Sequence, residues 1–449
     1  MDPVTALAAW AADDPWGRSG APTREALRRA MANLLAVAAG GAAAESSRRL
    51  RAAWATVPGP ATVFGETRGG SVESAAWLNS VAAVYQERDE GNRHAKGHPG
   101  AQTVFAVLAL AEERGVDGDR LWAGLLAGYE IAARVGRATA FAPGVHTHGP
   151  LGAVGAAAGC AVVLGLDAAG IAAAIDAGAA MAPATSWRAV DGGSAVRDQW
   201  VGQGAVAGLA AARYAAAGAE GRAHGLDGSL AGGLGVIDAS DLLSGLGTHH
   251  LVDSSYLKRH SSCAYTHGAA DAALIARERM TDVGRSFGDI DAVLVEGVAS
   301  AAALDSTEWT TRMGAYFSVP FVVASALVHG DVAAHRATGA EHEIRDLAPK
   351  IRVVDATEAL APATATSRPA RVTVRLRDGS EFRGAVRHPA GDSIDSPFSA
   401  EMQHHLLREA AASAGLDGSD IERAVRALAT GPVRDALRPL ISQFEGVHA

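Results

Sequence analysis

Apolar residues recur at the spacing of an α-helix over most of the first 267 residues. Leu27, Met31, Leu34 and Leu35 fall on one face of such a segment, and the apolar positions of residues 121–136 repeat in the same way. Alanine and glycine are abundant, while aromatic residues make up only 5% of the chain. Small side chains let helix backbones approach closely, so the pattern predicts a large helical domain.

Several residues mark where these helices begin, end or touch. Ser71 stands where it can cap the helix that runs into residue 84, and Gly115 ends the helix that follows. Gly155 and Gly159 lie in the most apolar run of the chain, residues 150–166. No strand pattern leads into this run, so we interpret the glycines as points of close helix contact and not as a dinucleotide-binding fingerprint.

The pattern changes to a strand period after about residue 280. Residues 289–300 and 350–356 have strand character, and residues 371–389 alternate around Asp378-Gly379, a hairpin turn signal. Helical spacing then returns from residue 399 onward. The sequence therefore predicts a mostly α fold. A large all-helical domain is formed by residues 1–267 and 393–449, and an α+β lid domain, residues 268–392, is inserted between its two segments.

Composition narrows the classes of function. The chain has 449 residues and a formal charge of -9, which argues against nucleic acid or an anionic membrane as the main partner. Two cysteines, Cys160 and Cys263, are too few for a disulfide framework or an all-cysteine metal site. The apolar run at residues 150–166 is short for a membrane span. We expect a soluble cytoplasmic protein.

A polar loop at residues 85–101, between two helical patterns, is the main candidate for chemistry. It holds Asp89, Asn92 and His98 together with the cations Arg93 and Lys96. Loops carried by a rigid scaffold are common places for proton-transferring side chains. The alternative interpretation is a solvated loop between helices.

Three further segments hold histidines or cations beside helix starts. His146 and His148 lie in residues 143–150, where metal ligation is disfavoured because no third ligand is suggested nearby. Arg197 lies at a helix start, a place where a cation is disfavoured unless an anion is held there. Lys258 and His267 belong to a third cluster, and Lys258 is one of only three lysines in the chain.

The ordered set of these motifs resembles the MmgE/PrpD family, which includes 2-methylcitrate dehydratase, cis-aconitate decarboxylase and iminodisuccinate epimerase. The resemblance rests on DEGN (89–92), GHPGA (97–101), GVHTHGPLGAVGAAAG (144–159), the stretch 258–267 and FSVPF (317–321), and it covers nearly the whole chain. It implies a helical domain with a lid, a homodimer, and catalysis without a metal or an organic cofactor.

The resemblance also suggests roles for individual residues. It places active-site groups at Asp89, His98, His146, Arg197 and His267, with Asn92, Lys96 and Lys258 beside them. We expect the catalytic residues to be Asp89, His98, His146, His267 and Lys258. We expect the substrate-binding residues to be Asn92, Arg93, Lys96, His148, Arg197 and Tyr265. Two positions depart from the cis-aconitate decarboxylase-like members: Arg197 replaces a lysine and Phe321 replaces a tyrosine. Both departures count against decarboxylation. Arginine keeps its charge but does not exchange a proton in turnover, and phenylalanine lacks the hydroxyl with which a tyrosine could donate one.

The chemistry of di- and tricarboxylates determines which groups such an active site needs. Removing a proton α to a carboxylate adds charge to a group that is already anionic, so cations and a water-poor cleft are needed. We expect a cofactor-independent hydro-lyase with His267 as base and His98, oriented by Asp89, as acid. The reverse pairing, or a part for His146, is also open. Alternatives are an epimerase, isomerase or decarboxylase, and a non-catalytic binding protein.

Overall fold

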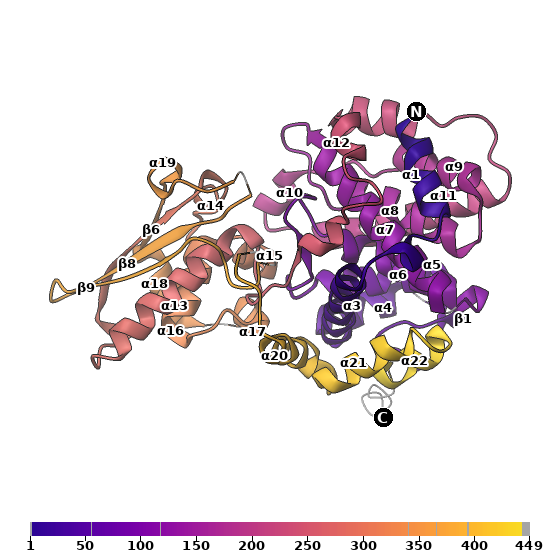
Figure 1. Cartoon of the computed structure of the whole chain (residues 1–449). Coiled ribbons are helices and arrows are strands. Elements are labelled where there is room, and N and C mark those ends of the chain that lie inside the picture. The colour runs from indigo at the N-terminus through magenta and orange to yellow at the C-terminus, as the bar shows by residue number, and fades with distance from the viewer. Residues whose placement is uncertain are drawn as a thin grey trace.

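The computed structural model describes residues 2–54, 56–116, 118–339, 341–364, 366–392 and 395–441. Most of them are helical, which confirms the predicted mostly α class. Buried apolar side chains form two separate cores. One core gathers residues from Val4 to Val252 and from Leu407 to Leu440, and the other lies mainly in residues 263–376. Figure 1 shows the two parts side by side, with the sheet at the left.

We call the first part the helical body. Its elements before the sheet are α1 (Pro3–Ala12), α2 (Pro15–Arg18), α3 (Ala21–Ala42), α4 (Glu45–Trp54), β1 (Pro58–Ala61), α5 (Val72–Val84), β2 (Gly91–Asn92), α6 (Pro99–Arg114), α7 (Gly118–Ala138), β3 (Thr139–Phe141), α8 (Pro150–Val163), α9 (Ala168–Ala180), α10 (Trp187–Asp191), α11 (Val196–Ala216), β4 (Gly235–Ile237), α12 (Ala239–Leu243) and β5 (Ser255–Tyr256), with a π-helical segment over Gly225–Leu234. As predicted, Ser71 caps α5 and Gly115 closes α6 in the left-handed conformation.

Helix α8 lies against α7 with almost no space between the two backbones. A Cβ atom on Gly155 would lie 2.6 Å from the carbonyl oxygen of Gly128, and one on Gly159 would lie 2.7 Å from that of Gly124. These positions therefore have to be glycine, which confirms their interpretation as points of close helix contact.

We call the second part the α+β lobe. Its elements are α13 (His267–Thr281), β6 (Ile290–Gly297), α14 (Ala299–Ala302), α15 (Arg312–Tyr316), α16 (Val319–His329), α17 (Ala334–Thr338), α18 (His342–Leu347), β7 (Ile351–Asp355), α19 (Thr357–Leu360), β8 (Ala370–Leu376) and β9 (Glu381–Val386). The strand order is β7-β6-β8-β9, and only the β6–β7 pair is parallel. In Figure 1, α13 and α16 lie on the same side of the sheet. The predicted turn at Asp378-Gly379 joins β8 to β9.

The chain then returns to the helical body as α20 (Ala400–Ala411), α21 (Gly418–Ala427) and α22 (Val433–Ile441). Gln86 donates a hydrogen bond to the Ala410 carbonyl at 2.9 Å, and Ser413 donates one to the Gly40 carbonyl at 2.9 Å. In Figure 1 these helices run beneath α3 and α4. The predicted boundary between the lid and the second helical segment falls on residues 393–394, outside the described residues.

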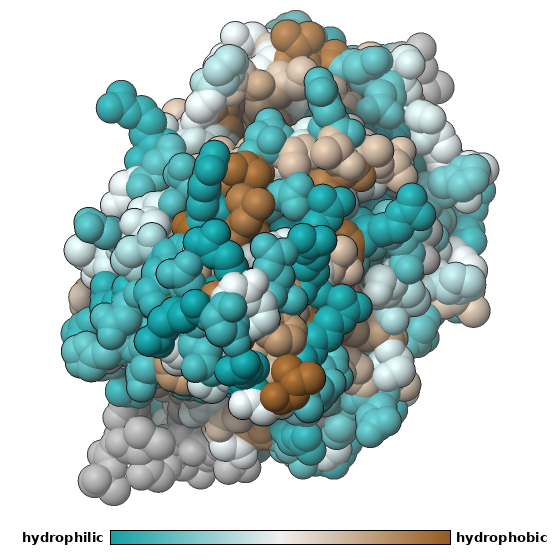
Figure 2. Space-filling model, turned by 90° about the vertical axis from the view of Figure 1, so that its left-hand side faces the viewer, coloured by the Kyte–Doolittle hydropathy of each residue, from teal (hydrophilic) through white to brown (hydrophobic). Residues whose placement is uncertain are grey.

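The outer surface of the lobe is polar. Figure 2 views the molecule from the lobe end, and apolar side chains gather there only in small patches among hydrophilic ones. The exposed apolar residues of the lobe are scattered and include Val283, Phe287 and Leu294. None of the described helices combines the length and the hydropathy that crossing a membrane requires.

Candidate active site

A short ladder brings two distant polar segments together. β2 and β5 are antiparallel, with Gly91 opposite Tyr256 and Asn92 opposite Ser255. Two residues further along this register, Asp89 faces Lys258, and Oδ1 of Asp89 lies 3.6 Å from Nζ of Lys258. Gly91 has to be small, since a Cβ there would lie 2.4 Å from the Tyr256 ring. The predicted loop is therefore buried, and the alternative of a solvated loop is wrong.

Two carboxylates and two cations form a buried charge network at this point. Nη1 of Arg197 lies 2.5 Å from Oε2 of Glu87, and Nζ of Lys258 lies 3.0 Å from Oε1 of Glu87. Together with Asp89, these side chains are 0–2% exposed. Burial acts to raise the pKa of Glu87, but Arg197 and Lys258 together lower it to about 2. Burial raises the pKa of Asp89 to about 6, so its negative charge is the less well compensated one.

Glu87 holds its place at a conformational cost. Its φ of 51° lies in the left-handed region, which a residue with a side chain adopts at a cost of about 1–3 kcal/mol. The backbone leaves α5 just before it, and the N–H of Glu87 donates to the Val84 carbonyl at 3.1 Å. The turn aims the carboxylate inward at both cations. The sequence analysis missed Glu87, because an acidic residue just after a helix is an ordinary surface feature.

His98 is held at Nδ1 by a hydrogen bond to a backbone carbonyl, and a carboxylate lies close to the same nitrogen. Nδ1 lies 2.7 Å from the Glu90 carbonyl oxygen and 3.1 Å from Oδ2 of Asp89. A carbonyl only accepts, so Nδ1 carries the proton and Nε2, on the opposite edge of the ring, is left with its lone pair. Burial, followed by the charge of Lys258, lowers the pKa of His98 well below its ordinary value. The ring is therefore neutral near pH 7 and able to accept a proton at Nε2.

Glu90 fixes the backbone that carries these groups. Its side chain accepts hydrogen bonds from the N–H of Gly100 at 2.7 Å and from the hydroxyl of Tyr129 at 2.9 Å. Gly100 lies in the first turn of α6, directly after His98 and Pro99. Burial raises the pKa of Glu90 to about 8. Glu90 thus ties the start of α6 to α7 and positions His98 through its own carbonyl.

His146 and His148 extend the site as a row of rings. The ring centroids of His98 and His148 are 5.2 Å apart, and those of His148 and His146 are 4.7 Å apart. The backbone N–H of His148 donates to Nδ1 of His146 at 3.1 Å, so Nε2 of His146 carries the proton. Nη2 of Arg197 lies 3.4 Å from Nε2 of His148. Burial lowers the pKa of both histidines well below the ordinary value.

A small pocket of about 60 Å³ opens between these groups and the α+β lobe. Typical small-molecule pockets are roughly 300–1,000 Å³, so the site is closed in this structure. The pocket is lined by Glu87, Lys96, Gly97, His98, His146, Thr147, His148, Trp187, Arg197, Tyr256, Cys263, Ala264, Tyr265, Phe317 and Arg368. A second cavity of about 20 Å³ lies beside it and shares Tyr256 and Arg368 in its wall.

The structure separates the predicted site residues into groups. Those that line the pocket are Lys96, His98, His146, His148, Arg197 and Tyr265. Asp89 and Lys258 lie directly behind it in the charge network. Arg93 and His267 line the second cavity. Phe321 packs 5.1 Å from the ring of Trp309 in the lobe core, away from the pocket wall.

Three of the predicted residues make contacts that support the backbone. Asn92 donates to the Leu251 carbonyl at 2.6 Å and accepts from the N–H groups of the two residues after Arg93. Nζ of Lys96 donates to two carbonyls at the end of α7, those of Arg137 at 3.0 Å and Thr139 at 2.8 Å. Arg93 forms an ion pair with Asp392, at 3.0 Å.

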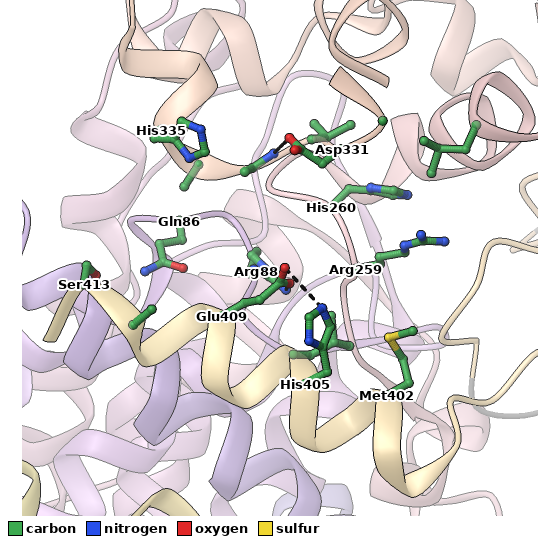
Figure 3. A pocket seen from close by; sticks show the side chains of 17 residues that line it. Gln86, Arg88, Arg259, His260, Asp331, His335, Met402, His405, Glu409 and Ser413 are labelled. Carbon is green, nitrogen blue, oxygen red and sulfur yellow. Dashed lines mark hydrogen bonds and ion pairs between the residues drawn. The ribbon is translucent and has the colours of Figure 1, made fainter. Parts of the chain in front are cut away.

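A larger hollow of about 540 Å³ lies on the other side of the segment that carries Glu87. Gln86 and Arg88 face this hollow, whereas Glu87 between them faces the pocket. Figure 3 shows Glu409 and His405 on α20 below and His335 and Asp331 of the lobe above. Arg88 forms an ion pair with Glu409 at 3.1 Å, which ties the segment to α20.

Within the ranges that the structure describes, no three His, Cys, Asp or Glu side chains have an arrangement that would hold a metal ion.

Fold and site together define a two-part, mainly helical protein with a buried cluster of histidines next to ion-paired cations. The family model of the MmgE/PrpD N-terminal domain matches residues 5–240, and that of the MmgE/PrpD C-terminal domain matches residues 260–424. The chain therefore belongs to the MmgE/PrpD family, which confirms the resemblance and supports a dehydratase-like or related enzymatic activity. A search of curated proteins gave no match.

Proposed function

We propose that the protein is a cofactor-independent hydro-lyase that acts on a 2-methylcitrate-like di- or tricarboxylate. The observation that carries the proposal is the position of His98. Its Nδ1 is fixed by Glu90 and Asp89, and its neutral Nε2 edge faces a pocket that also holds Arg197. A neutral imidazole of fixed tautomer, beside a fixed cation, is suited to removing a proton α to a carboxylate.

We assign the base to His98 rather than to His267. Nε2 of His267 lies 3.2 Å from the Ser262 carbonyl, and its ring lines the second cavity and not the pocket. His98 also has a carboxylate directly behind it. When His98 takes up a proton, Asp89 stabilises the imidazolium, as the carboxylate does in a nucleophile–histidine–carboxylate triad.

The carbanion that follows needs positive charge at the adjacent carboxylate. Arg197 supplies it from a position where Glu87 and the ring of Phe317, 5.7 Å from the guanidinium carbon, hold it in place. A preorganised cation in a water-poor pocket stabilises developing charge without having to reorganise. His148 accepts from Arg197 and so helps to fix its orientation.

Loss of the hydroxyl group needs a proton donor on the far side of the substrate. His146 presents Nε2–H and lies 4.5 Å, centroid to centroid, from Trp187, which shields it from water. A bound carboxylate beside this row raises the pKa of the histidines, because a neighbouring negative charge favours the protonated ring. His146 then takes up a proton from solvent at Nδ1, which breaks the hydrogen bond from the His148 N–H, and the imidazolium donates its Nε2 proton to the hydroxyl, which departs as water.

Proton NMR in deuterated water tests this proposal. The panel is 2-methylcitrate, citrate, cis-aconitate, malate-type hydroxy acids and iminodisuccinate. A new vinylic signal from a hydroxy acid is the expected result. Deuterium exchange without an alkene would indicate an epimerase or isomerase, and loss of carbon dioxide would indicate a decarboxylase. Absence of both turnover and exchange across the panel would refute the proposed substrate class.

The proposal extends to the assembly and the place of action. We propose a homodimer that works in the cytoplasm, and that residues 268–392 act as a lid over the helical domain. Light scattering of the purified protein tests the dimer. A monomeric mass at micromolar concentration would contradict it.

A further inference from the structure

Arg368 is a cation of the pocket wall that has no carboxylate partner among the described residues and lacks the two short hydrogen bonds to backbone carbonyls that hold Lys96. It lies just before β8 and reaches the pocket from the lobe. Its guanidinium carbon lies 5.3 Å from the ring centroids of both Tyr256 and Tyr265, and Nη1 lies 3.5 Å from the Ala264 carbonyl. Among the residues that the structure describes, no carboxylate lies within ion-pair distance of it.

The charges of the buried network beside the pocket cancel one another. Glu87 and Asp89 oppose Arg197 and Lys258 at distances of 2.5–3.6 Å. The three histidines of the row are neutral, because burial lowers their pKa. Lys96 and Arg368 are the two lining cations outside this network. The amine of Lys96 donates to two backbone carbonyls, at 3.0 Å and 2.8 Å, so Arg368 is the cation that is left for a ligand to neutralise. Buried or half-buried charges are normally paired, so an anion is the missing partner.

Arg368 also separates two small cavities. It lines both the pocket and the second cavity, and Tyr256 is the other shared wall. With about 60 Å³ and 20 Å³, neither cavity has the size of an ordinary small-molecule pocket. A substrate of citrate size needs a wall to move. The side chain of Arg368 contacts the Ala264 carbonyl and the two tyrosines but has no ion pair among the described residues, so it is held less firmly than the ion-paired Arg197.

We propose that Arg368 binds a second carboxylate of the substrate, remote from the carbon that loses its proton, and thereby selects di- and tricarboxylates over monocarboxylates. The proposal rests on the proposed function and deepens it. The first carboxylate lies at Arg197, and the remote one moves Arg368 aside and joins the two cavities. A planar guanidinium holds a carboxylate by two parallel hydrogen bonds, and the rings of Tyr256 and Tyr265 form its rigid backing.

Binding of an unreactive tricarboxylate tests the inference without turnover. Isothermal titration with tricarballylate is made on the full-length protein, on Arg368→Gln, on Arg368→Lys and on Arg371→Gln. Arg371 lies three residues further on, in β8, but pairs with Glu296 at 3.0 Å, so it is the matched control. Arg368→Gln should weaken binding by about 10- to 150-fold, the range expected when a charge-assisted hydrogen bond is lost. Arg368→Lys should recover part of this loss, and Arg371→Gln should bind as the unmodified protein does.

The binding measurements can overturn the proposed role of Arg368 in several ways. Unchanged tricarballylate binding in Arg368→Gln, or no saturable binding by the unmodified protein, overturns the inference. Equal weakening in Arg371→Gln also overturns it, because the effect would then be general. If Arg368→Gln does not fold, as judged by circular dichroism, the lysine variant decides: affinity within twofold of the unmodified protein overturns bidentate recognition. Arg368-dependent binding without alkene formation would refute the proposed function and leave the inference standing.

Discussion

Asp89→Asn should stabilise the protein while it abolishes activity. The carboxylate of Asp89 is buried, and its nearest cation, Lys258, is 3.6 Å away and also shared with Glu87. Its ionised form is therefore undercompensated when the site is empty, as its raised pKa of about 6 shows. Asparagine has nearly the same shape and no charge, so it removes this cost.

The magnitude follows from the pKa shift. The value rises from 3.8 to about 6, and each unit of difference corresponds to 1.36 kcal/mol, so ionised Asp89 costs about 3 kcal/mol at pH 7. Because the pKa is raised on folding, the cost is absent below about pH 4, grows between about pH 4 and 6, and is complete above. For 449 residues that unfold in one step, about 3 kcal/mol shifts the Tm by about 3 °C.

Thermal melts measure this destabilisation by ionised Asp89. They are recorded at pH 4.5, 5.5 and 7 for the unmodified protein and for Asp89→Asn. The difference in Tm between the two should grow with pH and reach its full value by pH 7. Asp176→Asn is the control, because Asp176 is also buried but accepts backbone N–H groups of His224 at 2.8 Å and Gly225 at 2.9 Å. The same substitution should therefore destabilise there and leave kcat unchanged. A Tm of Asp89→Asn equal to or below that of the unmodified protein at pH 7 would refute the reasoning.

Three further changes probe the base, the charge network and the helix contact. His98→Asn should lower kcat/KM by about 10²- to 10⁴-fold with a near-normal Tm, and a smaller loss than for His267→Asn would reverse our assignment. Glu87→Gln removes the nearest carboxylate of Arg197 and of Lys258, whose other carboxylate contacts are 3.6 Å long, and should destabilise by about 3–5 kcal/mol in urea unfolding; less than 1 kcal/mol would contradict the network. Gly155→Ala should cost about 1–3 kcal/mol, whereas Gly232→Ala, in open space, should cost little.

The fold was largely predictable because its signals are local. Ser71, Gly115 and the pair at Asp378-Gly379 act through their own backbone conformation, and the structure shows each of them in its predicted place. The glycines of α8 were also interpreted correctly, since small residues in an apolar helix have few other uses. The β2–β5 ladder was missed, because two residues per strand leave no periodic pattern to detect.

The site was predictable only where its residues carry unusual chemistry. His98 and His146 stand out in a sequence as side chains that titrate near neutral pH. Glu87 and Arg368 do not stand out, because acids after helices and arginines before strands are common on surfaces. Their importance comes from burial and from the approach of distant segments, and both are features of the tertiary structure. Lys96 shows the converse: it lines the pocket, but its amine caps the end of α7.

The charge network gives its two carboxylates different tasks. Glu87 lies 2.5–3.0 Å from both cations, so its charge is compensated before any reaction takes place. Asp89 lies 3.1 Å from Nδ1 of His98 and gains a close partner only when His98 becomes an imidazolium. At an effective dielectric constant of 20, a charge pair at that distance is worth about 5 kcal/mol. The uncompensated charge of Asp89 therefore has two effects: it destabilises the folded protein, and it stabilises the protonated form of His98. This is why Asp89→Asn should raise the Tm and lower the rate together.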